Sequence, residues 1–310
     1  MTRIRARRVG VVFGCAAALL LCAAQPAAAH AGGLRPLAYR STVTGIVPPV
    51  PGLQATMVNN GTELELRNGS DSVVTVLAAA AGPAPRVVLP GQTVRYRDPR
   101  TGWPADAERP GSPVPDRATA TDGGTRRDWQ VPILAGSGQA TITGELRWPE
   151  APEPLWWSAL ILALAAGGHL LGRSRWWRPG LAVAAVLVTA ANIGHITGSV
   201  LAVTGADFVP LFLGASGVGL VCWPLAAIAV IAAVRGRPAT AFAAAVAGAA
   251  LVVAGIPDYD SFRYAQLPFA GPADLDRLAL AVTLGGGARL ATGGFSAMRR
   301  MVGETSAEVR

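Results

Sequence analysis

Residues 181–203 read LAVAAVLVTAANIGHITGSVLAV and decide the class of this chain, because they contain no acidic residue and no arginine or lysine. A helix needs about 20 apolar residues to cross a hydrocarbon layer about 30 Å thick, and this run is long enough. Four more apolar runs of comparable length lie near residues 155–172, 208–234, 239–256 and 278–297. We therefore expect a five-helix transmembrane bundle within a domain that covers residues 151–298.

The composition agrees with an integral membrane protein. Of the 310 residues, 51% are hydrophobic and 15% are charged, and the mean hydropathy is +0.37. Soluble domains carry about 25% charged residues, so an integral membrane protein is the default expectation, and a disordered or fibrous chain is excluded. The net charge of +8 comes from arginines at the N-terminus and beside the apolar runs. Because a nucleic-acid site needs basic residues clustered on one folded face, no nucleic-acid partner is expected.

Arginines also predict the orientation of the bundle. They follow the first, third and fifth apolar runs, at Arg173, Arg175, Arg178, Arg235, Arg237, Arg299 and Arg300. The positive-inside rule places such connections in the cytoplasm. We expect residues 299–310 to form a cytoplasmic tail and the part before residue 151 to lie outside a bacterial cytoplasmic membrane, with membrane lipids as partners.

Residues 1–29 have the pattern of a secretory signal peptide. Four arginines precede an apolar run over residues 9–24. The small residues Ala27-Ala28-Ala29 then fit a cleavage site, and Ala29-His30-Ala31 fits one as well. An uncleaved signal anchor is the alternative.

Residues 30–150 show the pattern of an extracytoplasmic β-domain. Residues 62–67 alternate between polar and apolar side chains, and Asn60-Gly61 before them predicts a hairpin with residues 53–59. Residues 139–148 alternate again, with Ala140, Ile142, Leu146 and Trp148 on one face. Short strands at this spacing predict an all-β antiparallel sandwich. Residues 98–127 are rich in proline and polar residues, so we expect a disordered loop there.

Three histidines are the candidate ligands of the chain. Cleavage after Ala29 would make His30 the first residue, and its amine and ring nitrogen can together bind copper. His169 and His195 lie in the first and second apolar runs. At about 1.5 Å per residue they differ by roughly 10 Å in depth, too far to share one metal ion. His195 shares a helix face with Asn192, and either a neutral hydrogen-bonded histidine or a proton or metal relay fits this placement.

Arg289 lies near the middle of the fifth apolar run, after three glycines. A charge at that depth is costly unless it is paired or solvated. A structural clamp on carbonyl groups and a pocket for an anion or lipid headgroup fit the position equally well.

Motifs of common enzymes are missing from the sequence. It has no Ser-centred elbow, Walker loop, HExxH or CxxC. Cys15 and Cys22 lie in the signal region and Cys222 in a later apolar run, which excludes a cysteine-based zinc site. Asp258 and Asp260 are expected in a solvated loop outside the membrane, with cation binding as the alternative.

Three stretches resemble an uncharacterised family of bacterial envelope membrane proteins: YRSTVTGIVPPVP at 39–51, LELRNGSDSVVTVL at 64–77 and QLPFAGPADLDRLALAVTL at 266–284. The resemblance implies a signal peptide, a β-sandwich ectodomain and a C-terminal helical bundle, often in copper-related contexts. Members often carry a histidine-rich run that would fall near residues 109–127, where this chain has no histidine.

These patterns favour a non-enzymatic membrane protein that presents a binding or scaffolding β-domain to an envelope partner, with no cofactor. An accessory protein for copper or another metal, using His30 and His195, is the first alternative. A small transporter or lipid-binding bundle centred on Arg289 is the second.

Overall fold

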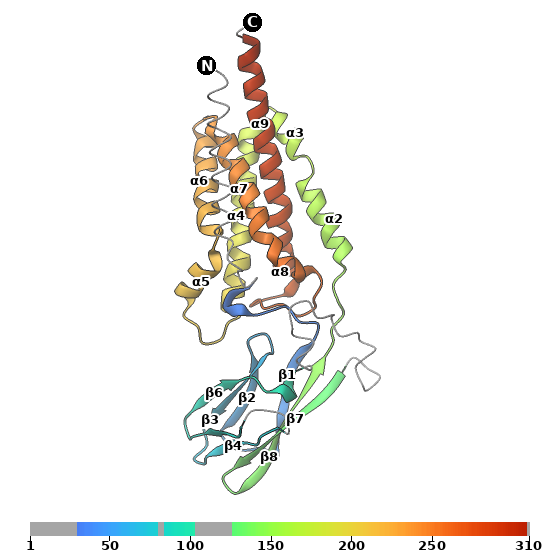
Figure 1. Cartoon of the computed structure of the whole chain (residues 1–310), viewed down its shortest axis with the longest axis vertical. Coiled ribbons are helices and arrows are strands. Elements are labelled where there is room, and N and C mark those ends of the chain that lie inside the picture. The colour runs from blue at the N-terminus through green and yellow to red at the C-terminus, as the bar shows by residue number, and fades with distance from the viewer. Residues whose placement is uncertain (1–29, 80–83, 103–125, 309–310) are drawn as a thin grey trace.

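A computed structural model of the chain describes residues 30–79, 84–102 and 126–308. An antiparallel β-region (residues 40–147) is followed by a helical region (residues 154–308), and the β-region lies against one end of the helices (Figure 1). The predicted signal peptide and most of the predicted disordered loop lie outside the described residues.

Two antiparallel sheets form the β-region. The larger sheet has the strand order β1-β8-β7-β4-β5, and the smaller has the order β2-β3-β6. The strands are β1 (Arg40–Val47), β2 (Leu53–Val58), β3 (Glu63–Asn68), β4 (Val74–Val76), β5 (Arg86–Val88), β6 (Thr93–Tyr96), β7 (Arg126–Ala135) and β8 (Gly138–Arg147).

The predicted hairpin is confirmed. β2 pairs with β3 from Leu53↔Asn68 to Val58↔Glu63. Between them Asn59 and Asn60 have φ angles of 53° and 60°, and Gly61 has a φ of 80°. Asparagine and glycine tolerate this left-handed conformation better than other residues, so the turn chemistry sets the register of the pair.

Alternation along the strands places one core between the two sheets. The four residues expected on one face of the strand at 139–148 are all buried in it. Leu64 and Leu66 of the smaller sheet belong to the same cluster as Ile142 and Leu146 of the larger sheet. Burial of these apolar faces against each other stabilises the β-region.

The prediction of a disordered loop over residues 98–127 is wrong at both ends of that segment, where the chain makes defined contacts. The carboxylate of Asp98 accepts a hydrogen bond from the amide of Arg100, and the carbonyl of buried Thr101 accepts one from Ser41 Oγ at 2.7 Å. At the other end β7 begins at Arg126 and pairs with β8 over its whole length. The pairing of β7 with β8 and the burial of Trp129 stabilise the strand despite the polar residues at its start.

Eight α-helices follow in the described residues: α2 (Pro154–Ala165), α3 (Gly168–Arg173), α4 (Trp177–Leu201), α5 (Phe208–Ser216), α6 (Gly219–Val234), α7 (Ala239–Gly255), α8 (Ala273–Ala281) and α9 (Gly287–Glu308). Three short elements complete the helical region and its approach: η1 (Ala31–Gly33), η5 (Ile256–Phe262) and η6 (Val282–Gly286).

Three helices are long and apolar enough to cross a membrane: Pro154–Arg173, Trp177–Leu201 and Ala239–Phe262. The pair α5 and α6, bent by 74°, is a fourth if it counts as one span. The predicted fifth span at 278–297 is not among the spans found in the described residues. α9 continues to Glu308, so the helix does not end at the predicted boundary between the membrane domain and the tail.

Small residues allow α9 to pack closely on α7. A Cβ atom added to Gly294 would lie 2.4 Å from the carbonyl oxygen of Ala241. The backbones therefore approach each other at a distance that only glycine permits.

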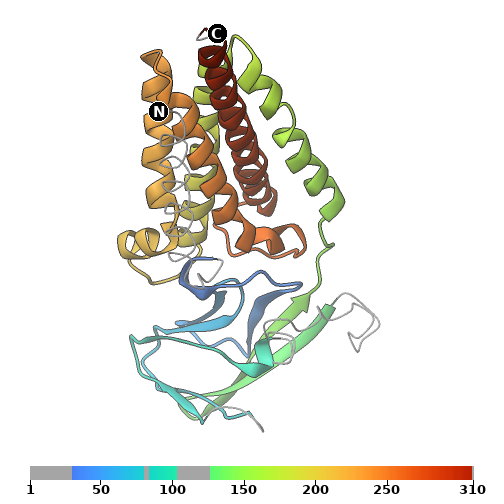
Figure 2. The ribbon, with the colours of Figure 1, turned by 45° about the horizontal axis from the view of Figure 1, so that its top comes forward.

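Polar contacts join the β-region to the helices. The amide of Thr204, after α4, donates to Asn59 Oδ1 at 2.8 Å, and Leu37 forms an isolated bridge with Gln266. The segment from His30 to Tyr39 runs between the sheets and the helix ends (Figure 2). The chain that leads into β1 is therefore part of the contact between the two regions.

Candidate functional site

Two histidines and two aspartates meet at the end of the bundle that faces the β-region. His30 precedes η1, His195 lies in α4, Asp258 in η5 and Asp276 in α8. They are 3%, 4%, 7% and 0% exposed, respectively. We call these four residues the His/Asp cluster. Such polar groups are rarely buried together without a structural or functional role.

His195 lies between the two carboxylates. Its Nδ1 is 2.7 Å from Asp276 Oδ1, and its Nε2 is 3.3 Å from Asp258 Oδ2. The imidazole ring can donate to both oxygens only when both nitrogens carry a proton. In this state His195 balances the charge of one aspartate.

His30 approaches the other oxygen of Asp258. Its Nδ1 lies 3.5 Å from Asp258 Oδ1, and its Nε2 lies 3.5 Å from Ser261 Oγ. The ring centroids of His30 and His195 are 6.0 Å apart. Burial of the ring lowers the pKa of His30 below its usual value, despite the nearby Asp258 carboxylate, so the ring is neutral at pH 7. Neutral imidazole is the form that binds metal ions.

Several buried polar atoms of the His/Asp cluster make no hydrogen bond to any residue that the structure describes. They include His30 Nδ1, Asp258 Oδ1 and Asp276 Oδ2. Buried polar atoms of this kind are nearly always partnered in folded proteins. The His/Asp cluster thus holds two carboxyl groups and one imidazole that contacts both of them, with acceptor atoms left over. The surroundings therefore favour an additional cation.

Arg277 positions both aspartates without neutralising them. Its Nε donates to the carbonyl of Ser261 at 3.0 Å, and its NH2 group donates to the carbonyl of Tyr264 at 2.8 Å. Its NH1 group pairs with Asp274 at 2.6 Å. Because Arg277 is next to Asp276 in α8, these bonds fix η5, which carries Asp258, against α8.

The segment after His30 is anchored in the bundle. Ala31 is buried against Ile196 and Val200 of α4. Gly32 has a φ of 66°, and a Cβ atom there would lie 2.9 Å from the side chain of Val203. This close fit holds the backbone of His30 beside α4.

The spacing within the cluster is close to that of metal ligands. Two ligands about 2.0–2.1 Å from an ion at a tetrahedral angle lie about 3.4 Å apart. The two nitrogen-to-oxygen distances at Asp258, 3.5 Å for His30 and 3.3 Å for His195, are near this value. Still, no group of three or more His, Cys, Asp or Glu side chains within the described ranges is arranged to hold a metal ion. A further ligand would be needed.

The other histidine and the asparagine from the sequence analysis lie elsewhere. Asn192 is buried, and its Oδ1 accepts from Trp223 Nε1 of α6 at 2.9 Å, not from His195. His169 is exposed on α3. Of the three histidines, His30 and His195 are the two that the structure brings together.

Arg289 closes the break between α2 and α3. Its Nε donates to the carbonyl of Leu164 at 2.6 Å, and its NH2 group donates to the carbonyl of Ala166 at 2.7 Å. Helix α2 ends there, and Gly167 has a φ of 77°. A cation beside free carbonyls at a helix C-terminus is stabilising, so these contacts favour the structural clamp.

Asp276 was missed as a site residue, and Asp258 was considered for cation binding only as the alternative to a solvated loop. The expectation of a solvated loop at Asp258 is wrong, because this side chain is buried against His195, whereas Asp260 is exposed beside Arg263. A signal for Asp276 was present in the sequence: it precedes Leu280 by one helical turn and so falls on the apolar face of α8.

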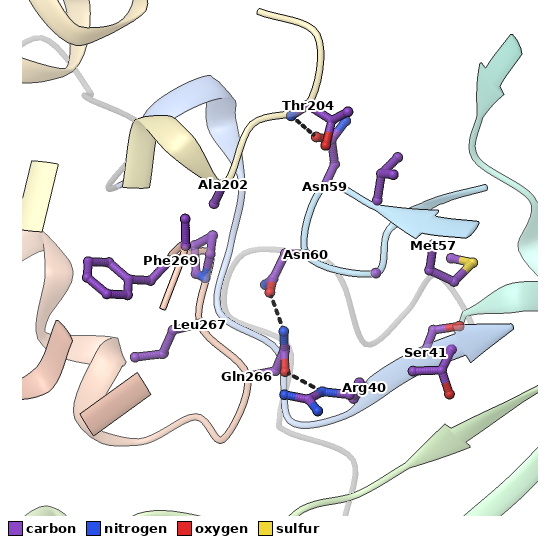
Figure 3. A pocket seen from close by; sticks show the side chains of 15 residues that line it. Arg40, Ser41, Met57, Asn59, Asn60, Ala202, Thr204, Gln266, Leu267 and Phe269 are labelled. Carbon is purple, nitrogen blue, oxygen red and sulfur yellow. Dashed lines mark hydrogen bonds between the residues drawn. The ribbon is translucent and has the colours of Figure 1, made fainter. Parts of the chain in front are cut away.

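A pocket of about 450 Å³ lies between the β-region and the helices (Figure 3). On its wall Gln266 accepts from Arg40 Nε at 3.0 Å and donates to Asn60 Oδ1 at 2.9 Å. None of the four cluster residues lines it. Its polar side chains bond the two regions to each other.

Comparison with protein-family models, with curated proteins and with solved structures finds no match to this chain. Function is therefore inferred from the residues of the His/Asp cluster and the bundle.

Proposed function

We propose that this chain is a non-enzymatic membrane protein of the bacterial envelope that binds a transition-metal ion, most readily Cu²⁺, at the His/Asp cluster. The observation that carries the proposal is that Asp258 stands between the imidazoles of His30 and His195, at near-ligand spacing from both. Nitrogen and carboxylate ligands suit divalent transition metals, and Cu²⁺ binds most tightly among them. A metal-handling accessory protein is the role that fits this site.

The proposed topology has a β-sandwich outside the cell and five spans in the cytoplasmic membrane. The bent pair α5 and α6 is the third span, and α8, η6 and α9 together are the fifth. Support comes from the arginine-rich connections after α3 and after α6, which lie at the end of the bundle remote from the β-region (Figure 1). The cluster then lies at the extracytoplasmic end, where envelope metal ions are accessible.

A scaffold for an envelope partner is the second candidate. β5 is an edge strand, and the pairing Val74↔Val88 extends the ladder toward Val73 and Leu89. Val73, Val87 and Leu89 are all exposed. Apolar side chains at a sheet edge favour contact with another protein.

Metal content tests the first proposal. The protein is purified from membranes in detergent in its processed form, loaded with Cu²⁺ or Zn²⁺, washed extensively and assayed by elemental analysis. We expect near-stoichiometric Cu²⁺ in the native chain and its loss in His195→Ala and Asp258→Asn. His169→Ala is the matched control, because that exposed histidine lies outside the cluster.

Circular dichroism separates loss of the ligand from loss of the fold. Asp258→Asn keeps the size of the side chain and should retain the helical signal while losing copper. Absence of retained metal in the correctly folded native chain would refute the metal-binding function and leave the scaffold.

A further inference from the structure

We infer that proteolytic removal of residues 1–29 completes the metal site by turning the backbone nitrogen of His30 into a ligand, an inference that rests on the proposed function. Water adds across the Ala29–His30 amide in the peptidase reaction and yields the Ala29 carboxylate and the His30 amine. Binding of Cu²⁺ then displaces a proton from the ammonium form of that amine.

The structure distinguishes the two cleavage positions that the sequence offers. Cleavage after Ala31 would remove His30, which is 3% exposed and lies within contact of Asp258 and Ser261. It would also remove Ala31, which packs on Ile196 and Val200. Cleavage after Ala29 preserves all of these contacts, so we assign the mature N-terminus to His30.

The orientation of the ring favours chelation by His30. Its Nδ1, the ring nitrogen nearer its own backbone, faces Asp258, whereas Nε2 faces Ser261. A free amine and Nδ1 of one histidine can close a chelate ring around one ion. Nδ1 and Asp258 Oδ1 are both buried without a hydrogen-bond partner among the described residues, as expected for two ligands of the same ion.

The amine also supplies the ligand that the side chains lack. No three His, Cys, Asp or Glu side chains of the described segments form a site by themselves. The amine and Nδ1 of His30 with one oxygen of Asp258 make three ligands, while His195 Nε2 holds the other oxygen of Asp258 in place. Metal binding would thus depend on maturation of the chain.

The absence of lysine makes the amine selectively accessible to chemistry. All 27 basic residues are arginine, so the mature chain has one primary amine, that of His30. Treatment of the metal-free mature chain with an acetyl ester, followed by hydroxylamine to reverse acylation of tyrosine and histidine, blocks this amine alone. Intact mass and N-terminal sequencing verify both the single acetyl group and the start of the chain.

Cu²⁺ alone is the probe, and its affinity is compared between the untreated and the acetylated mature chain. We expect a loss of at least about tenfold on acetylation, because even outer partners of a metal site contribute that much. We also expect nitrogen hyperfine structure in the electron paramagnetic resonance spectrum of the untreated chain to change. His30→Ala should bind as weakly as the acetylated chain.

The outcomes separate the inference from the proposed function. Equal affinity of the acetylated and untreated chains would overturn the inference and leave the metal site standing. A mature chain that begins at Gly32, or equal binding by a chain that retains residues 1–29, would overturn it as well. No binding by the untreated chain that begins at His30 would overturn the proposed function itself.

Discussion

Nδ1 of His195 lies 2.7 Å from Oδ1 of Asp276, a buried contact between residues that are 81 positions apart in the chain. It fastens the C-terminal part of the long helix α4 to the short helix α8, and it leaves the other ring nitrogen directed at Asp258. One imidazole therefore sets the distance between two carboxylates that come from different elements.

Removing Asp276 should destabilise the bundle strongly. Breaking a buried charged pair costs about 3–5 kcal/mol, since the remaining partner stays buried and uncompensated. We expect Asp276→Ala to lower the midpoint of thermal unfolding in detergent, followed by circular dichroism. Asp274→Ala is the matched control on the same helix: its side chain is 82% exposed, and its ion pair with Arg277 contributes about 1 kcal/mol or less. Equal effects of the two substitutions would contradict a buried charged contact at Asp276.

Arg289→Ala should weaken the attachment of α2 to α9. The carbonyls of Leu164 and Ala166 would lose their donor, at a cost of about 1–3 kcal/mol. Limited proteolysis in the connection after β8, together with thermal unfolding, measures the effect. Arg299→Ala, an exposed arginine on the same helix, should leave both unchanged. If Arg289→Ala instead lowered binding of anionic lipid vesicles at unchanged stability, the clamp would be the wrong interpretation.

Gly294→Val should prevent normal packing of α9 on α7. The added side chain begins 2.4 Å from the carbonyl oxygen of Ala241, a backbone atom that cannot move aside without displacing α7. We expect loss of cooperative unfolding and a low yield of folded protein. Gly303→Val changes the same residue type on the same helix, where a Cβ atom meets nothing within 4 Å, and should fold normally.

Because of Tyr96, the free energy of unfolding of the β-region should decrease at alkaline pH. Burial raises the pKa of its phenol well above the usual value of about 10, and the Asp98 carboxylate adds to the shift. The unfolded chain releases this proton near pH 10 while the native chain retains it. Stability is therefore complete below pH 10 and falls as the pH rises further, by about 1.4 kcal/mol per pH unit. Denaturant unfolding at several pH values should show a shallower decline for Tyr96→Phe, and an identical decline would contradict the shift.

The sequence allowed some strands to be predicted because their signals are local. Asn60-Gly61 marked the turn between β2 and β3, and strict alternation marked the buried face of β8. β7 was hidden, although Trp129, Val131 and Ile133 alternate, because Pro132 within it and the polar flank before it both argue against a strand. β1 was missed because its register shifts between Val43 and Gly45, which interrupts the period of two.

The site was harder to predict because its members are distant in sequence. Polarity within apolar runs singled out His195, and the cleavage pattern singled out His30. No local sequence pattern indicates that Asp258 contacts His195, because that contact depends on how Arg277 fixes η5 against α8. Depth along the membrane did separate His169 from His195, and the structure keeps these two residues apart.

The contact between His30 and Ser261 joins residues 231 positions apart, and it has a consequence for the order of assembly. His30 can meet Ser261 only after most of the chain has been synthesised. The early segment therefore stays without these partners until α4, η5 and α8 have been synthesised one after another. A nascent chain that stops before residue 276 would lack Asp276, and His195 would then have no carboxylate opposite its Nδ1.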